Sequence, residues 1–450
     1  MTEARLRRTV AGIPLLGRRD PRDKPARSNG IAVDGRSPAR GATRTLRGPQ
    51  RERHEPDFVI LVTVVALSAV GILMVYSTSG VDAYLAFRDT FALVSPQLLW
   101  GLMGVVAMLV LMRLDYRYLR LVSVPAYVAA LALLVVVLIP GVGEVVGGSA
   151  RWLEIEPLPR VHPAEFAKLA LVVYLAHWLA KKGTRIGSLV HGLVPFLVIA
   201  GSVIVLVALE PDLGTTGVIT LAAFTMLFAA GGSIWQMALM VPPGIAGVYL
   251  VVNHNAYQMD RIRAFLDPWA DPQGIGFHTV QGLLALGLGG ISGTGLGQSQ
   301  QPGSLVVPNA ENDFVFAVVG QELGLLGGVA VVALFLLFAY RGIRVALGAP
   351  DTFGALLATG ITGWLSLQAF INIGVVVALI PITGITLPFV SDGGSSLIVS
   401  FAAVGILLSI SRETQPRGTW NDADPHRGRR YGRPHLPRRG GPRPPARAGR

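Results

Sequence analysis

The chain has 450 residues, of which 51% are apolar and only 15% are charged, and its mean hydropathy is +0.53. Soluble domains carry roughly 25% charged residues, so this composition excludes an ordinary soluble protein and indicates a chain surrounded mostly by lipid. The net charge of +12 is concentrated at the two ends, since 14 of the 39 Lys and Arg residues lie in residues 1–56 and 11 lie in residues 412–450. The sequence contains no cysteine, which excludes disulfides and thiolate metal sites.

The two ends are rich in Arg, Gly and Pro and poor in the apolar residues that a folded core needs. We therefore predict a disordered basic tail over residues 1–56, a membrane domain over 57–412 and a second disordered tail over 413–450. A polybasic segment beside a membrane helix binds anionic lipid and helps to fix the topology. No aromatic platform accompanies these charges, so nucleic acid is not expected as a partner.

Apolar segments long enough to cross a bilayer start near Phe58, and the first is expected to remain as an anchor instead of being cleaved. Together the segments predict an all-α integral membrane protein with about ten transmembrane helices. They lie near residues 58–77, 93–112, 120–140, 162–180, 189–209, 214–231, 236–252, 313–339, 354–380 and 394–411. The sixth and seventh segments are the weakest, because glycine or proline interrupts them.

Positive residues cluster in alternate loops, which places both termini in the cytoplasm and two large loops outside. These extracytoplasmic loops cover residues 141–161 and 253–312. Structureless loops longer than roughly 15 residues are uncommon unless they are functional, so the active site is expected on this face. The apolar stretch 278–288 is too short to span and is expected to lie on or dip into the outer leaflet. No internal repeat is evident, which disfavours an inverted-repeat transporter.

Asp313 lies where the second large loop enters the eighth segment, followed directly by Phe314 and close to Phe316. A carboxylate half-buried beside two phenylalanines acquires a raised pKa and can act as a base near neutral pH. Aspartate is also a favoured N-cap residue. The residues alone favour the cap.

Other ionisable residues near the ends of the segments need a reason to be there. The i, i+3 spacing of Glu165 and Lys168 places them on one helix face, where a structural ion pair and a substrate contact are equally open. Glu210 and Asp212 form an acidic turn, a weak sign of a cation site because calcium takes roughly six to eight oxygen ligands.

Arg151, Arg261 and Arg263 lie in the outer loops, where arginine can clamp a pyrophosphate through paired hydrogen bonds. Anchoring of helix ends at the interface is the open alternative. His162 and His278 belong to no His-x-x-x-His pattern, so no zinc site is expected.

The motifs, taken in order, resemble the SEDS family, which contains the FtsW, RodA and SpoVE proteins. The similar segments cover nearly the whole membrane domain. They are Val75-Tyr76-Ser77, Ala150-Arg151-Trp152-Leu153, Pro163-Ala164-Glu165-Phe166-Ala167-Lys168-Leu169, Glu210-Pro211-Asp212-Leu213-Gly214-Thr215, Asp260-Arg261, Asn312-Asp313-Phe314-Val315-Phe316-Ala317, Glu322-Leu323-Gly324, Asn372-Ile373-Gly374 and Gly393-Gly394-Ser395-Ser396. The run Asp267-Pro268-Trp269-Ala270-Asp271-Pro272 is more similar to the FtsW branch, associated with division, than to the RodA branch.

The resemblance implies a peptidoglycan glycosyltransferase that polymerises lipid II outside the cytoplasmic membrane. It implies a class B penicillin-binding protein as the transpeptidase partner, alongside other divisome or elongasome proteins. The family's catalytic aspartate falls on Asp313, which replaces the cap as the favoured interpretation. The candidate substrate contacts are Arg151, Glu165, Lys168, Arg261, Arg263, Ser395 and Ser396. Glu210, Asp212 and Glu322 are cation-binding or structural candidates, and a divalent cation, Mg²⁺ or Mn²⁺, is the cofactor left open.

Two acidic residues depart from the family pattern. Glu311 stands in the place of a histidine before the catalytic aspartate, and Asp392 stands in the place of an aromatic residue. Their charge near Asp313 either raises its pKa, recruits a cation, or marks a divergent substrate or reduced activity. A lipid II flippase or transporter and a non-catalytic divisome scaffold therefore stay open as alternatives.

Overall fold

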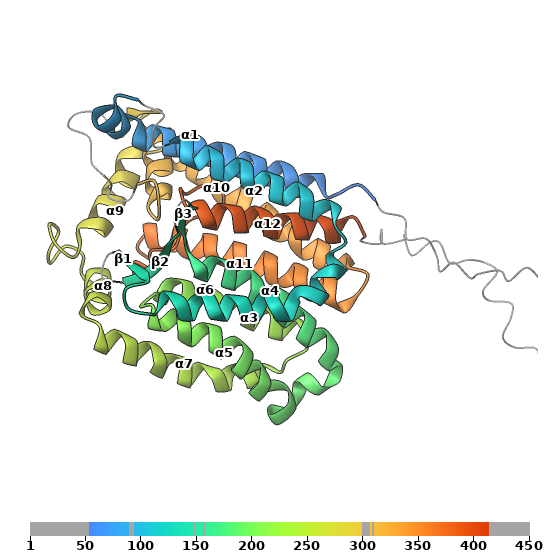
Figure 1. Ribbon diagram of the computed structural model, residues 1–450. Helices are drawn as coiled ribbons and strands as arrows, with labels where there is room; N and C mark the ends of the chain where they lie inside the picture. The colour runs from blue at the N-terminus through green and yellow to red at the C-terminus, as the bar shows by residue number, and fades with distance from the viewer. Residues whose placement is uncertain are drawn as a thin grey trace, which may run out of the picture. The chain divides into compact units, whose positions relative to one another are not determined.

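The computed structural model describes residues 54–89, 94–146, 149–155, 158–298, 307 and 310–413. The two predicted basic tails lie outside the described residues, except for residues 54–56 and 413. Most of the described chain is helical (Figure 1). The α-helices are α1 (Phe58–Phe87), α2 (Val94–Arg113), α3 (Leu119–Val137), α4 (Pro163–Lys182), α5 (Val194–Leu209), α6 (Leu213–Ala229), α7 (Ile234–His254), α8 (Ala256–Leu266), α9 (Phe277–Gly289), α10 (Val315–Gly348), α11 (Thr352–Val376) and α12 (Gly394–Ser411).

Each of the ten predicted segments coincides with one of these helices. Eight spans among the described residues are long and apolar enough to cross a membrane. Of the other two segments, α6 is apolar but has only 17 residues, and α4 carries four charged side chains, including Glu165 and Lys168. The predicted all-helical membrane fold is confirmed.

The seventh segment, weak in the sequence, forms the continuous helix α7. Its start is stabilised by a capping box, in which Ser233 and Gln236 satisfy each other's backbone N–H groups. Pro242 and Pro243 lie inside the helix without ending it. Membrane helices tolerate such prolines because local adjustments and neighbouring groups satisfy the freed carbonyls.

Helices α11 and α12 are the most buried of the candidate spans, whereas α7 is the most exposed. Helix α12 packs along α2, and α11 packs against α10, α6 and α4 (Figure 1). Glycine permits the closest approach, since a Cβ atom on Gly405 of α12 would lie 2.5 Å from the carbonyl oxygen of Met108 of α2. The centre of the fold is therefore formed by the last two spans of the chain.

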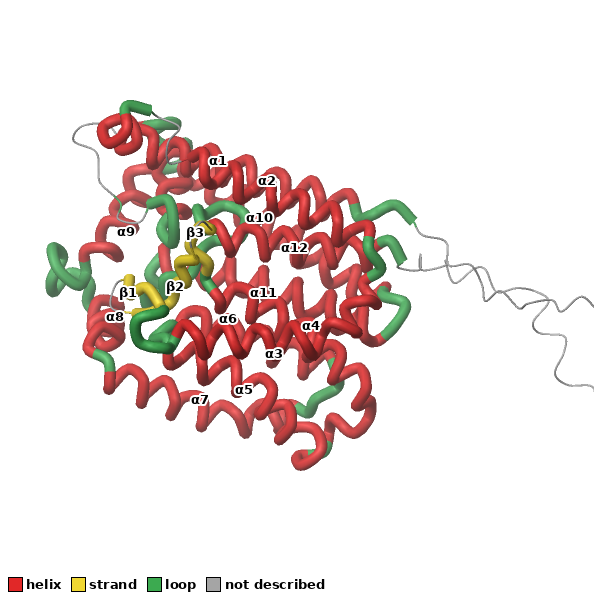
Figure 2. Tube along the Cα trace, viewed as in Figure 1, coloured by secondary structure: helices red, strands yellow, loops and turns green. Residues whose placement is uncertain are grey.

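The first large loop contains a small antiparallel sheet that the sequence did not predict (Figure 2). Its strands β1 (Gly143–Val146), β2 (Ser149–Ile155) and β3 (Leu158–Val161) pair in chain order. The Trp152 ring of β2 meets the His162 ring edge-on, with 5.1 Å between the ring centroids. This contact seats the sheet beside the start of α4.

The second large loop contains the two helices α8 and α9. Helix α9 packs against the first part of α10, where a Cβ atom on Gly289 would overlap the carbonyl of Gly320. Helix α10 kinks at Gly324, whose φ of 68° belongs to the left-handed region that suits glycine. The stretch 278–288 is thus part of a short helix, and α10 is its main packing partner.

Candidate functional site

Asp313 lies in a turn of residues 310–314, which we name the Asp313 turn. Helix α10 begins at Val315, its N-cap residue is Phe314, and no side chain caps it. The alternative that Asp313 is an N-cap is therefore wrong. The Asp313 side chain is half-buried, and this burial raises the pKa of its carboxyl to about 6, with a smaller rise from Glu311 and an opposing effect of Arg261.

Of the two acidic departures from the family pattern, Glu311 lies in this turn and Asp392 lies beside it. The backbone N–H of Asp392 donates to the carbonyl of Glu311 over 2.8 Å. Burial raises the pKa of Asp392 to about 6, and the neighbouring Glu311 adds to the rise. The expected increase in negative charge near Asp313 is therefore present in the fold.

Arg261 lies close enough to Asp313 for its positive charge to act on that carboxyl. Its guanidinium lies over the Tyr257 ring, 4.4 Å from the centroid, and donates to the Tyr257 hydroxyl over 2.6 Å. A Cβ atom on Gly384 would lie 3.6 Å from Nη2 of this arginine, so the side chain reaches the loop between α11 and α12. Arg263 instead is largely exposed and pairs with Asp260 over 3.4 Å. Of these two predicted clamps, the fold brings Arg261 towards Asp313.

Glu165 and Lys168 form the pair that their spacing predicted. Lys168 Nζ lies 2.8 Å from Glu165 Oε1 and 2.9 Å from Gln368 Oε1, and it lies over the Trp364 ring. We name these four residues the α4 cluster, and all of them are buried. Gln368 carried no signal in the sequence, because a lone glutamine in an apolar helix resembles many others.

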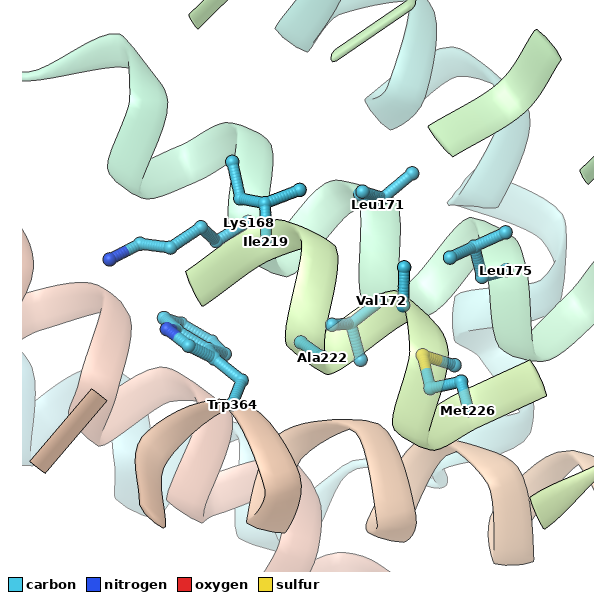
Figure 3. A pocket seen from close by; sticks show the side chains of 9 residues that line it. Lys168, Leu171, Val172, Leu175, Ile219, Ala222, Met226 and Trp364 are labelled. Atoms are coloured by element: carbon cyan, nitrogen blue, oxygen red, sulfur yellow. The ribbon is translucent and has the colours of Figure 1, made fainter. Parts of the chain in front are cut away.

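A small apolar pocket lies beside the α4 cluster (Figure 3). Lys168 and Trp364 lie on one side of it, and aliphatic side chains of α4 and α6, such as Val172 and Ala222, line the rest. The polar nitrogens of Lys168 and Trp364 already bond to Glu165 and Gln368, and the rest of the lining is apolar, so no polar group is left for a sugar. The pocket therefore adds nothing to recognition of the substrate's head group.

Ser395 and Ser396 lie in the first turn of α12, where they bond to the start of α4 and to the loop before α12. The backbone N–H of His162 donates to Ser395 Oγ over 3.3 Å, and Ser396 Oγ lies 3.2 Å from Thr386 Oγ1. These bonds join α12 to α4 and to the loop that precedes it. Both serines are buried in this structure.

Arg151 binds the acidic turn between α5 and α6 through the backbone. Its Nε and Nη2 donate to the carbonyls of Glu210 and Pro211 over 3.2 and 2.6 Å. Asp212 caps α6 by accepting from the N–H of Thr215 over 3.0 Å. The structure thus gives Arg151 and Asp212 local structural contacts, and it brings neither to Asp313 through a hydrogen bond.

Glu210 is almost fully buried, and its two carboxylate oxygens find no hydrogen-bond partner among the described residues. Burial and then Asp212 raise the pKa of Glu210 to about 8, which Arg151 opposes, so the carboxyl is largely protonated at neutral pH. Within the described ranges, no three His, Asp or Glu side chains are arranged to hold a metal ion. The described residues therefore offer no three-ligand site for the divalent cation that the sequence left open.

Glu322 bridges distant parts of the fold. Its carboxylate accepts from Ser77 Oγ of α1 over 2.6 and 2.8 Å, and Ser77 Oγ in turn accepts from the N–H of Gly297. These contacts lie beside the kink of α10 at Gly324. These contacts support the structural alternative for Glu322, and a cation-binding role stays a prediction.

Comparison with known proteins decides the family. The model of the cell cycle protein family of FtsW, RodA and SpoVE matches residues 58–416, which is nearly the whole membrane domain. The chain belongs to this family. The resemblance inferred from the motifs is confirmed, and with it a multi-pass membrane protein.

The relatives are similar along almost their whole length. The stage V sporulation protein E of Bacillus subtilis is 42% identical over 361 residues, which cover 80% of this chain and 98% of that protein. The probable peptidoglycan glycosyltransferase FtsW of Geobacter metallireducens is 42% identical over 369 residues, covering 82% and 97%.

Two solved structures share the fold. A chain from a peptidoglycan synthase complex, described as coordinating polymerization and crosslinking, is 28% identical with a TM-score of 0.65, covering 79% of this chain and 98% of that chain. The rod shape determining protein RodA of Thermus thermophilus is 27% identical with a TM-score of 0.58, covering 80% and 98%. Both are aligned over nearly their full lengths, so the helical membrane unit is a shared one.

Replacing Glu311 by glutamine is expected to lower the pKa of Asp313, because a negative neighbour disfavours ionisation of the aspartate. If Asp313 must be ionised for activity, the acidic limb of the rate profile then moves to lower pH, and the variant keeps more activity than wild type at pH values below about 6. The measurement is the pH dependence of glycan synthesis.

The matched control is Glu154→Gln, which removes an equal charge from an exposed side chain in β2. Its pH profile should overlay that of wild type. An unchanged profile for Glu311→Gln would show that Glu311 does not influence the titrating group.

Proposed function

We propose that this protein polymerises peptidoglycan by transferring lipid-linked disaccharide-peptide units, lipid II, to growing glycan strands. Membership of the family and the FtsW-type glycosyltransferases among its relatives support this activity. The observation that carries the catalytic assignment is the half-buried Asp313, whose pKa of about 6 leaves a base ionised at neutral pH.

The proposed reaction is a single displacement with inversion. The 4-hydroxyl of the acceptor's GlcNAc attacks the anomeric carbon of the donor, a new C–O bond forms, and the bond to undecaprenyl pyrophosphate breaks. Asp313 accepts the hydroxyl proton as general base, which requires the hydroxyl to bind within hydrogen-bond reach of its carboxylate. The electron pair of the broken bond leaves with the pyrophosphate.

Arg261 is the proposed stabiliser of the departing pyrophosphate. Its charge acts on Asp313, and its guanidinium is held in place by Tyr257. Guanidinium groups pair with phosphate oxygens in a planar, bidentate geometry, which stabilises negative charge as it develops in the transition state. Arg263 is the weaker candidate, because it is largely exposed and pairs with Asp260.

We also propose that both termini are cytoplasmic and that the sheet, α8 and α9 face the outside. The backbone N–H of His54 donates to the carbonyl of Arg412 over 2.8 Å, so the membrane unit begins and ends at one place, as an even number of crossings requires. The excess of Arg and Lys at these ends supports the cytoplasmic side. A class B penicillin-binding protein is the proposed partner, in line with the synthase complex that contains the similar chain.

The test is polymerisation of purified lipid II by the full-length protein with its cognate penicillin-binding protein in proteoliposomes. We expect long glycan strands that muramidase degrades, and none from the penicillin-binding protein alone. Movement of lipid II across the bilayer without polymer would favour the flippase. A bound partner with neither polymer nor lipid movement would favour the scaffold.

A further inference from the structure

Three consecutive backbone carbonyls of the Asp313 turn accept hydrogen bonds from three donors that lie far away in the sequence. The Asp392 N–H donates to Glu311 over 2.8 Å, and Ser391 Oγ donates to Asn312 over 2.5 Å. Asn372 Nδ2 donates to the carbonyl of Asp313 itself over 2.8 Å. These three bonds hold the main chain of the turn, and none of them involves the Asp313 carboxylate.

The side-chain amide of Asn372 can donate to two backbone carbonyls at once. It lies in α11 and is only 1% exposed, and its Nδ2 also donates to the carbonyl of Ile385 over 2.7 Å. An amide nitrogen carries two hydrogens, one for each carbonyl, whereas the flipped amide would place Oδ1 against two carbonyl oxygens. The orientation of the side chain is therefore fixed by its two acceptors.

Besides the Asp313 turn, Asn372 binds the loop between α11 and α12 (residues 377–393). One helical turn earlier on α11, Gln368 Nε2 donates to the carbonyl of Thr386 over 3.0 Å, next to the Ile385 carbonyl that Asn372 binds. Ser391 of the same loop accepts from the N–H of Leu387 over 2.8 Å. One face of α11 thereby positions the loop, and the loop and Asn372 together position the Asp313 turn.

We propose that Asn372 is a positioning residue for glycosyl transfer, acting by fixing the backbone of the Asp313 turn so that the carboxylate stays aimed at the acceptor hydroxyl. This inference rests on the proposed function. Ser391 supports the same turn one residue earlier, through a single bond. Reacting groups must lie within a few tenths of an ångström of their productive geometry, and misplacement by about 1 Å can cost about 10²-fold in rate.

The test compares Asn372→Ala and Ser391→Ala with wild type in the full-length protein, with the cognate penicillin-binding protein and lipid II. We expect Asn372→Ala to lower kcat by about 10- to 100-fold with KM nearly unchanged, and Ser391→Ala to lower it several-fold. In an Asp313→Asn background, Asn372→Ala should cause no further loss, because residues that act as one unit are not additive. Wild-type kcat for Asn372→Ala, or an equal loss in both backgrounds, would overturn the proposal.

The pH profile separates positioning from mere stabilisation. A released turn exposes the Asp313 carboxylate to water, so its pKa falls towards the ordinary value and the acidic limb of activity moves to lower pH. The charged and titratable groups that act on this carboxylate or lie around it are Arg261 of α8, His278 of α9, and Glu311 and Asp392, and all are retained in the variants. A lower rate with an unmoved acidic limb would contradict the proposal.

Ser409→Ala is the matched control. It removes one buried hydrogen bond of α12, from Ser409 Oγ to the carbonyl of Leu114 over 2.6 Å, outside the Asp313 turn. Its rate and pH profile should equal those of wild type. If Asn372→Ala does not fold, the pH profile of Ser391→Ala tests the proposal instead. A profile equal to that of Ser409→Ala would overturn it. If the wild-type protein forms no polymer from lipid II, the proposed function is refuted. If Asp313→Asn is fully active, only the assignment of Asp313 as the general base is refuted.

Discussion

Replacing Asp313 by asparagine is expected to reduce polymerisation of lipid II by about 10²- to 10⁴-fold, because the amide has nearly the same shape but cannot accept the hydroxyl proton. In the wild-type protein the rate should rise as the pH passes about 6, where burial places the pKa of this carboxyl, and then level off. The measurement is initial rate of strand synthesis at several pH values.

Two comparisons make this prediction sharp. Asp313→Glu keeps a carboxylate but moves it by one methylene, so it should retain more activity than Asp313→Asn. Thermal unfolding in detergent should be similar for both variants and wild type, because no side chain caps α10 and Phe314 holds the cap position. Full activity of a folded Asp313→Asn would place the base elsewhere.

Replacing Lys168 by methionine is expected to destabilise the protein by about 3–5 kcal/mol, because it leaves the Glu165 carboxylate buried without its partner. Lys168 Nζ also binds Gln368, and Gln368 positions the loop between α11 and α12. The measurement is the midpoint of thermal or denaturant unfolding in detergent. An unchanged midpoint would show that the pair contributes little.

The double variant Lys168→Met, Glu165→Gln separates the two roles that the sequence left open for this pair. It removes both charges, so much of the stability should return, because the neutral methionine and glutamine leave no uncompensated charge buried. A stable double variant that still polymerises lipid II assigns the pair a structural role. A stable but inactive one assigns it a contact with substrate.

Local patterns were enough to predict ten of the described α-helices, but not α8 and α9 of the second large loop. Apolar segments of spanning length need no knowledge of their neighbours, because a backbone in lipid must satisfy its own hydrogen bonds. The pairing of Glu165 with Lys168 was also predictable, since an i, i+3 spacing puts two side chains on one helix face whatever surrounds them. The small sheet was missed, because its strands are only 4 to 7 residues long and lie in a segment without a clear alternating pattern.

The long-range contacts were decided by the tertiary structure alone. Asn372 and Asp313 are 59 positions apart, Ser391 and Asn312 are 79 apart, and Lys168 and Gln368 are 200 apart. A sequence pattern records neighbours along one helix, whereas these partners meet only when α4, α10 and α11 pack together. The sequence by itself therefore determined the membrane helices and the family, and it singled out Asp313 as the candidate base. The packing decided which arginine lies towards Asp313 and which side chains hold its backbone.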